Sequence, residues 1–181
     1  VENFLVARRL MYWQVYLHKA SLCAEQILMN LIRRARALNS TGIDLGLSGP
    51  LMYFLSRDES LGLNDSGLDE FLKLDDIDVI SALKCWMNHQ DFVLSELSQI
   101  IMKRKLLKID IKEQAFSSKE IEQKRIKFAD KHNLSLDEAS YFVFTGSISN
   151  LAYNQSKENI QLLKKDGSLI DVAQASDQLH I

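Results

Sequence analysis

The sequence predicts a mainly helical protein that ends in a small α+β subdomain. Three observations lead to this fold class. Apolar residues recur at helical spacings over the first hundred residues, the 181-residue chain holds a single Pro, and near Leu106 the apolar period changes from 3.6 to 2. We therefore expect a helical region at 1–104 and an α+β subdomain at 105–181, in the order strand, helix, strand, strand, strand.

A long first helix is expected from about Asn3 to Leu38, because no Pro or Gly interrupts this stretch. Its second half keeps an apolar stripe at spacings typical of a helix, and three arginines in its last turns suit the helix dipole. The stripe consists of Leu22, Cys23, Ile27, Leu28, Leu31 and Ile32, and the arginines are Arg33, Arg34 and Arg36. We predict that this helix runs unbroken.

One face of the first helix carries a distinctive set of side chains. In a regular helix, Arg8, Tyr12, Tyr16 and Lys19 lie within about 80° of one another. A guanidinium, two phenols and an ammonium on one face are suited to holding an anion beside a ring. The alternative is a core helix whose polar heads reach its rim, and the spacing alone leaves both interpretations open.

The remaining helices of the first region are predicted from local signals. Pro50 suits the first turn of a helix, where its missing N–H costs nothing, and Asp75 suits an N-cap. Residues 56–67 are polar and contain Gly, which indicates a surface loop. The expected helical stretches are 51–55, 68–88 and 91–104.

The second region begins with a predicted strand at Leu106–Ile111, where Leu107, Ile109 and Ile111 alternate with charged residues. Ser117 or Ser118 is expected to cap a helix over 119–132. The aromatic and β-branched run 141–145 predicts a second strand.

A hairpin is predicted near the end of the chain. Asp166-Gly167 lies between the apolar runs 160–164 and 168–172, and Asp-Gly between two such runs is a strong signal for a tight turn.

Composition excludes several classes of protein. The net charge of −2 gives no reason to expect nucleic acid as a partner, and no apolar run approaches the length of a membrane span. Cys23 and Cys85 lie in apolar helical contexts and are expected to be reduced core residues of a cytoplasmic protein. A basic block at 101–131 has ten bases and five acids, which indicates either solvated helix faces or phosphate binding.

Two stretches resemble a known family. The run Arg8 to Lys19, with its Tyr-x-His-Lys ending, resembles the long helix that follows the metal site in HD-domain deoxynucleoside triphosphate triphosphohydrolases, the dGTPase-like family. The stretch 103–108 is similar to the family's Arg-x-Leu-x-Lys stretch, and the acidic run 72–78 between them also agrees. The resemblance covers roughly the first 110 residues and implies the helical bundle part of an HD-type phosphohydrolase.

The resemblance implies an activity and roles for individual residues. The reaction would release deoxynucleoside and tripolyphosphate from a deoxynucleoside triphosphate. Arg8 matches the active-site arginine against the triphosphate, Tyr16 the tyrosine beside the sugar, and Tyr12 a substrate position that is His in some members. The positions that match contacts to an effector nucleotide at a subunit interface are His18, Lys19, Arg104 and Lys108. Such proteins tend to form homo-oligomers.

One departure from the family is large. Its metal site needs a His, a His-Asp pair and a later Asp, and none of the four histidines here precedes an Asp. The resemblance therefore implies the C-terminal part of such an enzyme, with the divalent metal in a missing N-terminal part and no activity in this chain alone. The alternatives are a non-catalytic nucleotide-binding regulatory or oligomerisation module and, with no recognised motif, a nucleic-acid-binding domain.

Overall fold

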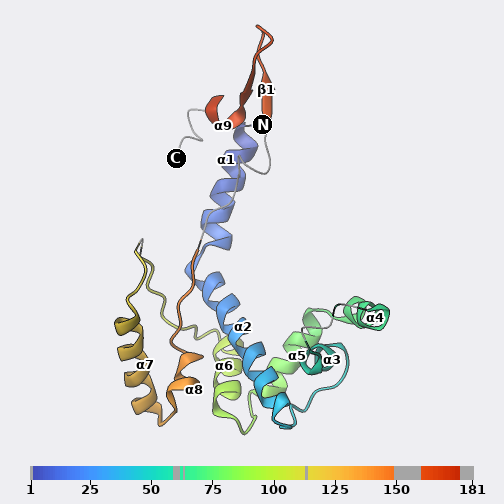
Figure 1. Cartoon of the computed structure of the whole chain (residues 1–181), viewed down its shortest axis with the longest axis vertical. Helices are drawn as coiled ribbons and strands as arrows, with labels where there is room; N and C mark the ends of the chain where they lie inside the picture. Colours follow the sequence, from blue (N-terminus) through green and yellow to red (C-terminus); the bar gives the residue numbers. More distant parts are fainter. Residues whose placement is uncertain (1, 59–61, 63, 113, 149–159, 176–181) are drawn as a thin grey trace. The chain divides into compact units, whose positions relative to one another are not determined.

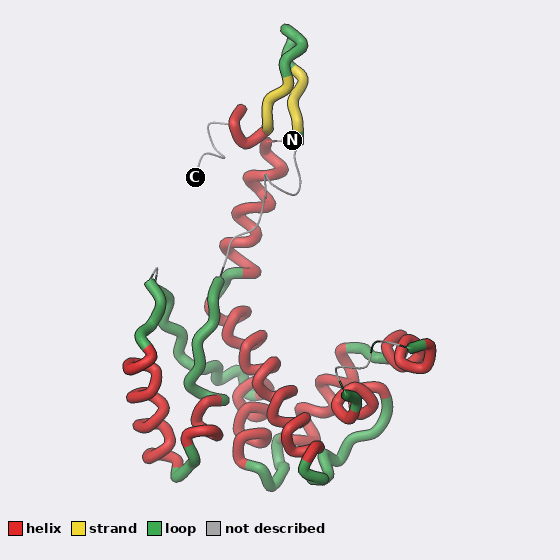
Figure 2. The backbone as a smooth tube through the Cα atoms, viewed as in Figure 1, coloured by secondary structure: helices red, strands yellow, loops and turns green. Residues whose placement is uncertain are grey.

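A computed structural model of the chain describes residues 2–58, 62, 64–112, 114–148 and 160–175. The chain forms two compact units, the first made of 1–22 with 146–181 and the second of 23–145. Residue 104, where the sequence predicted a domain boundary, lies inside the second unit. The predicted fold class is confirmed, because the described chain is mainly helical with one small antiparallel sheet (Figure 2).

The first unit opens with helix α1 (Glu2–Met11), followed by a π-helical turn η1 (Tyr12–Tyr16) and the start of α2 (Lys19–Ser40). The prediction of one unbroken helix was wrong. The N–H of Leu17 donates to the carbonyl of Tyr12 at 2.8 Å, an i to i−5 bond, and α2 begins anew after His18. Aromatic and β-branched residues in this turn lose side-chain freedom in an α-helix, so local preference for regular helix is weak.

The hairpin at the end of the chain is confirmed. Strand β1 (Gln161–Leu163) pairs antiparallel with β2 (Leu169–Asp171), and a short helix α9 (Val172–Ala175) follows. Gly167 has φ +85°, a conformation that glycine adopts without strain, and the Asp166 carboxylate accepts hydrogen bonds from the Ser168 N–H and hydroxyl.

The second unit is built around α2. Its buried side chains pack with those of α5 (Asp76–Trp86) and α6 (Phe92–Met102) in one hydrophobic cluster. Figure 1 shows the course of these three helices. The α2 members are Cys23, Ile27, Leu31, Ala35 and Leu38, spaced by three or four residues as predicted. The predicted helix after Pro50 is α3 (Pro50–Ser56), and α4 (Asp65–Lys73) precedes α5.

Side-chain caps fix where several helices begin. Asp75 forms a capping box at the start of α5, which confirms its predicted role. Ser117 caps α7 (Ser118–His132) and Ser135 caps α8 (Leu136–Ser140) in the same way. Such caps use residues only three positions apart, so the sequence alone could locate them.

Two predicted strands do not form. The segment 106–111 has no strand pairing, and Leu106, Leu107 and Ile109 pack instead against the helical core. The segment 141–145 forms a turn and a bend after α8. In it, the ring of Phe142 stacks on that of Phe128 in α7, with 4.9 Å between the ring centroids. In both places hydrophobic contact with helices replaces the hydrogen-bonded neighbour that a strand needs.

The two cysteines differ. Cys23 is buried, as predicted, and burial raises the pKa of its thiol, whereas Cys85 is exposed, so the prediction of a core position for Cys85 was wrong. In the part of the chain that the structure describes, every helix is too short or too polar to cross a membrane.

Candidate functional site

Three of the predicted site residues lie in a row, each next to the following one, in the first unit. The guanidinium carbon of Arg8 lies 5.9 Å from the centroid of the Tyr12 ring, within the range of cation–π attraction. The rings of Tyr12 and Tyr16 follow at 5.0 Å between centroids, tilted by 45°. Tyr16 is 54% exposed and Arg8 is half-buried, so neither is sealed inside the core. We call Arg8, Tyr12 and Tyr16 the Arg-Tyr ladder.

The π-helical turn keeps the two tyrosines together. A π-helix has more residues per turn than an α-helix, yet positions four apart still lie nearly above one another, so Tyr12 and Tyr16 remain neighbours. The helix is interrupted at Leu17 and His18, immediately after this turn. The regular-helix projection that placed Lys19 on the same face as Arg8 does not apply across this break.

His18 and Lys19 lie at the beginning of α2. The carbonyl of His18 accepts from the Leu22 N–H at 3.1 Å, and its Nδ1 accepts from the Ala20 N–H at 3.3 Å, so His18 caps this helix. Lys19 is exposed in the first turn, where a positive charge is unfavourable to the helix dipole. Both residues therefore present polar groups at a helix start.

Arg104, two residues after the end of α6, has an unusual backbone conformation. Its φ is +55°, in the left-handed region that residues with a Cβ rarely adopt. The N–H of Lys105 donates to the Ile100 carbonyl and that of Arg104 to the Ile101 carbonyl, both at 3.0 Å, which is a Schellman motif. Glycine is the usual residue at this position, so an arginine here costs backbone energy.

Lys108, in the irregular segment after α6, is 88% exposed. Its ammonium lies 3.5 Å from the Asp110 carboxylate, which also accepts from Lys124 at 3.1 Å. The hydrogen bond from Lys124, with the nearby charges of Lys108 and Lys124, lowers the pKa of Asp110. Lys108 thus has a carboxylate neighbour while its side chain stays exposed to solvent.

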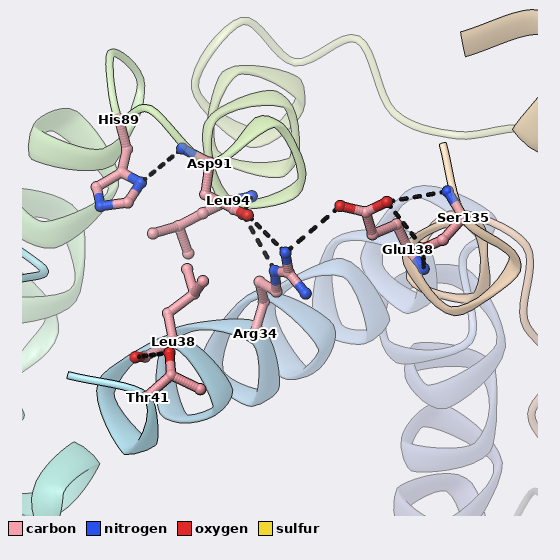
Figure 3. A network of polar contacts seen from close by, with 8 residues as sticks. All are labelled: Arg34, Leu38, Thr41, His89, Asp91, Leu94, Ser135 and Glu138. Carbon is pink, nitrogen blue, oxygen red and sulfur yellow. Dashed lines mark hydrogen bonds and ion pairs between the residues drawn. The ribbon is translucent and has the colours of Figure 1, made fainter. Parts of the chain in front are cut away.

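The second unit contains a polar network that the sequence did not predict (Figure 3). Arg34 of α2 binds the Asp91 carboxylate through two nitrogens, Nε at 3.1 Å and Nη2 at 2.5 Å, and Nη2 also lies 3.6 Å from Glu138 of α8. The guanidinium carbon lies 5.6 Å from the Tyr141 ring centroid. We call Arg34, Asp91 and Glu138 the closed arginine network.

Each carboxylate of the closed arginine network also caps a helix. Asp91 accepts from the Leu94 N–H at the start of α6, and Glu138 accepts from Ser135 at the start of α8. Burial by itself would raise the pKa of Asp91, but hydrogen bonds from Arg34 and the Leu94 N–H outweigh it, and the pKa lies below the ordinary value. The network therefore joins α2, α6 and α8.

Sequence reasoning missed this network for a definite reason. Arg34 and Asp91 are 57 residues apart, and periodicity carries no information on contacts between helices. The available signals were the N-cap spacing after Asp91 and the Ser-x-x-Glu pattern from Ser135. They predict helix starts and do not predict a shared arginine.

Among the described residues, no three His, Cys, Asp or Glu side chains group together in a way that could hold a metal ion. The residues of this chain that the structure describes therefore do not fit a metal centre. The described residues instead provide a cationic and aromatic surface, formed by the Arg-Tyr ladder.

Comparison with known proteins finds a solved structure and a curated protein that are similar to this chain. The crystal structure of a phosphohydrolase from Bacteroides thetaiotaomicron VPI-5482 is similar over 98% of this chain, with 39% sequence identity and a TM-score of 0.86. An uncharacterized protein of Bacillus subtilis (strain 168), YwfO, is 25% identical over 183 residues, which is 97% of this chain. No protein-family model matches the chain.

The chain spans less than half of either relative, 45% of the phosphohydrolase and 40% of YwfO. The helical fold and the sequence of this chain are thus similar to one portion of a larger phosphohydrolase.

Proposed function

We propose that this chain is part of a metal-dependent phosphohydrolase that cleaves deoxynucleoside triphosphates to deoxynucleoside and tripolyphosphate, and that its role is to contact the substrate. The observation that carries the proposal is the Arg-Tyr ladder, with Arg8 5.9 Å from the Tyr12 ring and Tyr12 5.0 Å from Tyr16. The 39% identity to a phosphohydrolase over 98% of the chain supports the reaction class.

The ladder has the chemistry that a nucleoside triphosphate requires. A guanidinium donates paired hydrogen bonds to phosphate oxygens and stays charged at every relevant pH, so Arg8 would stabilise charge that develops on the triphosphate. The exposed ring of Tyr16 offers a flat surface to the sugar. A phenol packed against a deoxyribose leaves little space for a ribose 2′-hydroxyl, which would favour deoxynucleotides.

We also propose, as the resemblance to HD-domain triphosphohydrolases implies, that the divalent metal this reaction needs is held by another part of the protein. Among the described residues, no group of His, Cys, Asp and Glu side chains could hold one. A bound metal would supply the activated water. The residues of this chain bind and orient the substrate.

His18, Lys19, Arg104 and Lys108 are proposed to bind an effector nucleotide in a homo-oligomer. Arg104 gives the best support, because it occupies a left-handed position where glycine would be less strained. A strained residue of this kind is expected where its side chain has a function. This observation also favours the second candidate, a regulatory or oligomerisation module that binds nucleotide without hydrolysis.

The proposal is tested by replacing Arg8 in the whole protein. We expect Arg8→Ala to lower kcat/KM for deoxynucleoside triphosphates by ~10²-fold or more, the scale of losing a preorganised charged donor. Release of tripolyphosphate is the measurement. Arg9→Ala is the matched control, because Arg9 is the next residue of α1 and has no ring contact in the described chain.

Near-normal kcat/KM in Arg8→Ala would remove Arg8 from the site. Nucleotide binding by the whole protein with no tripolyphosphate release under any divalent metal would favour the regulatory module instead.

A second prediction concerns the isolated chain. The 181-residue chain should release no tripolyphosphate from any deoxynucleoside triphosphate, because contacts to the substrate supply no activated water. Metal-dependent release by the purified chain would contradict the assignment of the metal to another part of the protein.

A further inference from the structure

A second cationic site lies within the second unit, in a cavity of about 330 Å³. Its walls come from α2, α7, the last residue of α8 and the segment after it, and they include two arginines and no carboxylate. The lining residues with charge, an amide or an aromatic ring include Asn30, Arg33, Arg125 and Phe144. None of these four belongs to the Arg-Tyr ladder or to the predicted effector positions.

Neutral acceptors orient both arginines. Arg125 of α7 is half-buried and donates from Nε to the carbonyl of Val143 at 2.8 Å. Arg33 of α2 donates from Nη1 to the side-chain oxygen of Asn30 at 3.3 Å. Asn30 is itself fixed, because it is only 5% exposed and donates to the Tyr141 carbonyl at 3.1 Å.

Each guanidinium has five N–H donors, and these contacts use one on each side chain. Within the described ranges, neither Arg33 nor Arg125 forms an ion pair with a carboxylate. The adjacent Arg34 differs, because it faces Asp91 and Glu138. Two positive charges without a carboxylate partner among the described residues therefore line one cavity, with donors available to an anion.

We propose that this cavity binds the phosphate group of a small phosphorylated molecule. Planar guanidinium groups match phosphate oxygens in pairs, and two of them from separate helices can hold one phosphate from two directions. The volume suits a ligand of nucleoside monophosphate size. The ring of Phe144 gives apolar surface for the part of the ligand that carries no charge.

The proposal also gives a role to the basic block of the sequence, since Arg125 is one of its ten bases. It does not depend on the proposed hydrolysis of deoxynucleoside triphosphates, because it uses none of the residues assigned to that reaction.

The experiment is titration calorimetry at low salt on the whole protein carrying Arg8→Ala, which removes the ladder's contribution. The probes are inorganic phosphate, a deoxynucleoside monophosphate and the same deoxynucleoside without phosphate. We expect saturable binding of the two phosphate-bearing probes, and a roughly tenfold or larger loss of affinity in Arg33→Gln, as for a lost hydrogen bond to a charged group.

Lys127→Gln is the matched control. It removes one positive charge from the exposed side of α7 without changing the cavity wall, so affinity should stay within about twofold. Arg125→Lys keeps the charge but loses the planar fork, and it should weaken binding several-fold. Circular dichroism checks that each variant is folded.

The relative affinities identify the ligand. Equal affinity for inorganic phosphate and the monophosphate supports a site for the phosphate group alone, whereas tighter monophosphate binding supports a contact of the organic part with Phe144. Equal binding of the deoxynucleoside without phosphate would overturn the proposal. So would the absence of saturable binding, an unchanged affinity in Arg33→Gln, or an equal loss in Lys127→Gln.

Discussion

Arg33 and Arg34 are neighbours in α2 with opposite surroundings. Arg34 is held by two carboxylates and a ring, and its side chain is 14% exposed. Arg33 is exposed, bonds to a neutral amide, and lines a cavity with Arg125. Successive residues of an α-helix point about 100° apart. Arg34 therefore joins three helices, while Arg33 faces solvent and the cavity, where a ligand could reach it. A carboxylate partner therefore distinguishes a structural arginine from one available for binding.

The largest effect is expected on stability, where replacing Arg34 and replacing Arg33 should have different consequences. Arg34→Gln should lower the free energy of unfolding by about 3 kcal/mol, because it leaves the largely buried Asp91 carboxylate without its ion-pair partner. Arg33→Gln should change stability by less than about 0.5 kcal/mol, as for a surface substitution. Urea unfolding of both variants measures this. Equal losses would show that Arg33 is also structural.

The pH dependence of stability should show Asp91 to be an acid-sensitive member of the closed arginine network. Its pKa is lower in the folded chain than in the unfolded one, so its stabilisation is complete above the unfolded value of about 3.9 and declines as pH falls through the lower folded value. The difference in unfolding free energy between wild type and Asp91→Asn should be constant from about pH 7 to 5 and shrink below about pH 4.

Other carboxylates titrate in the same range, among them Glu138, whose pKa is lowered by its bonds to Ser135. Carboxylates far from Asp91 cancel in the difference, whereas Glu138 contributes to it, because the charge of Asp91 acts on the pKa of Glu138. A difference that stayed constant down to about pH 2 would show that Asp91 and Arg34 do not interact as charges.

The smallest expected effect compares two helix ends. Arg104 after α6 and Asn133 after α7 both have left-handed φ values, +55° and +54°. Arg104→Gly should stabilise the fold by about 0.5 to 1 kcal/mol, since relief of the left-handed strain exceeds the entropy that glycine loses on folding. Asn133→Gly should gain less, because Asn tolerates this conformation. Thermal unfolding is the measurement.

The same variant bears on the proposed effector site. If Arg104 is retained for a ligand, Arg104→Gly should be more stable and bind nucleotide more weakly. A variant that is more stable with unchanged nucleotide binding would remove Arg104 from the site.

The sequence by itself determined what depends on near neighbours in the chain. Apolar spacing predicted most of the helices, the Asp75 and Ser117 caps act over three residues, and the Asp166-Gly167 turn closes its own hairpin. The Arg-Tyr ladder is also local, since its members are four residues apart and lie adjacent even through the π-helical turn.

Tertiary structure decided what depends on distant partners. Alternation at 106–111 indicates a half-buried segment, but a strand also needs a neighbour that bonds to it, and here helices cover the apolar side. Likewise, the positions of Arg33, Arg34 and Arg125 in the sequence do not reveal whether each side chain meets a carboxylate, a carbonyl or a cavity. Packing placed Asp91 against Arg34 and left Arg33 and Arg125 at a cavity, because the partners of a charge are chosen by how helices meet.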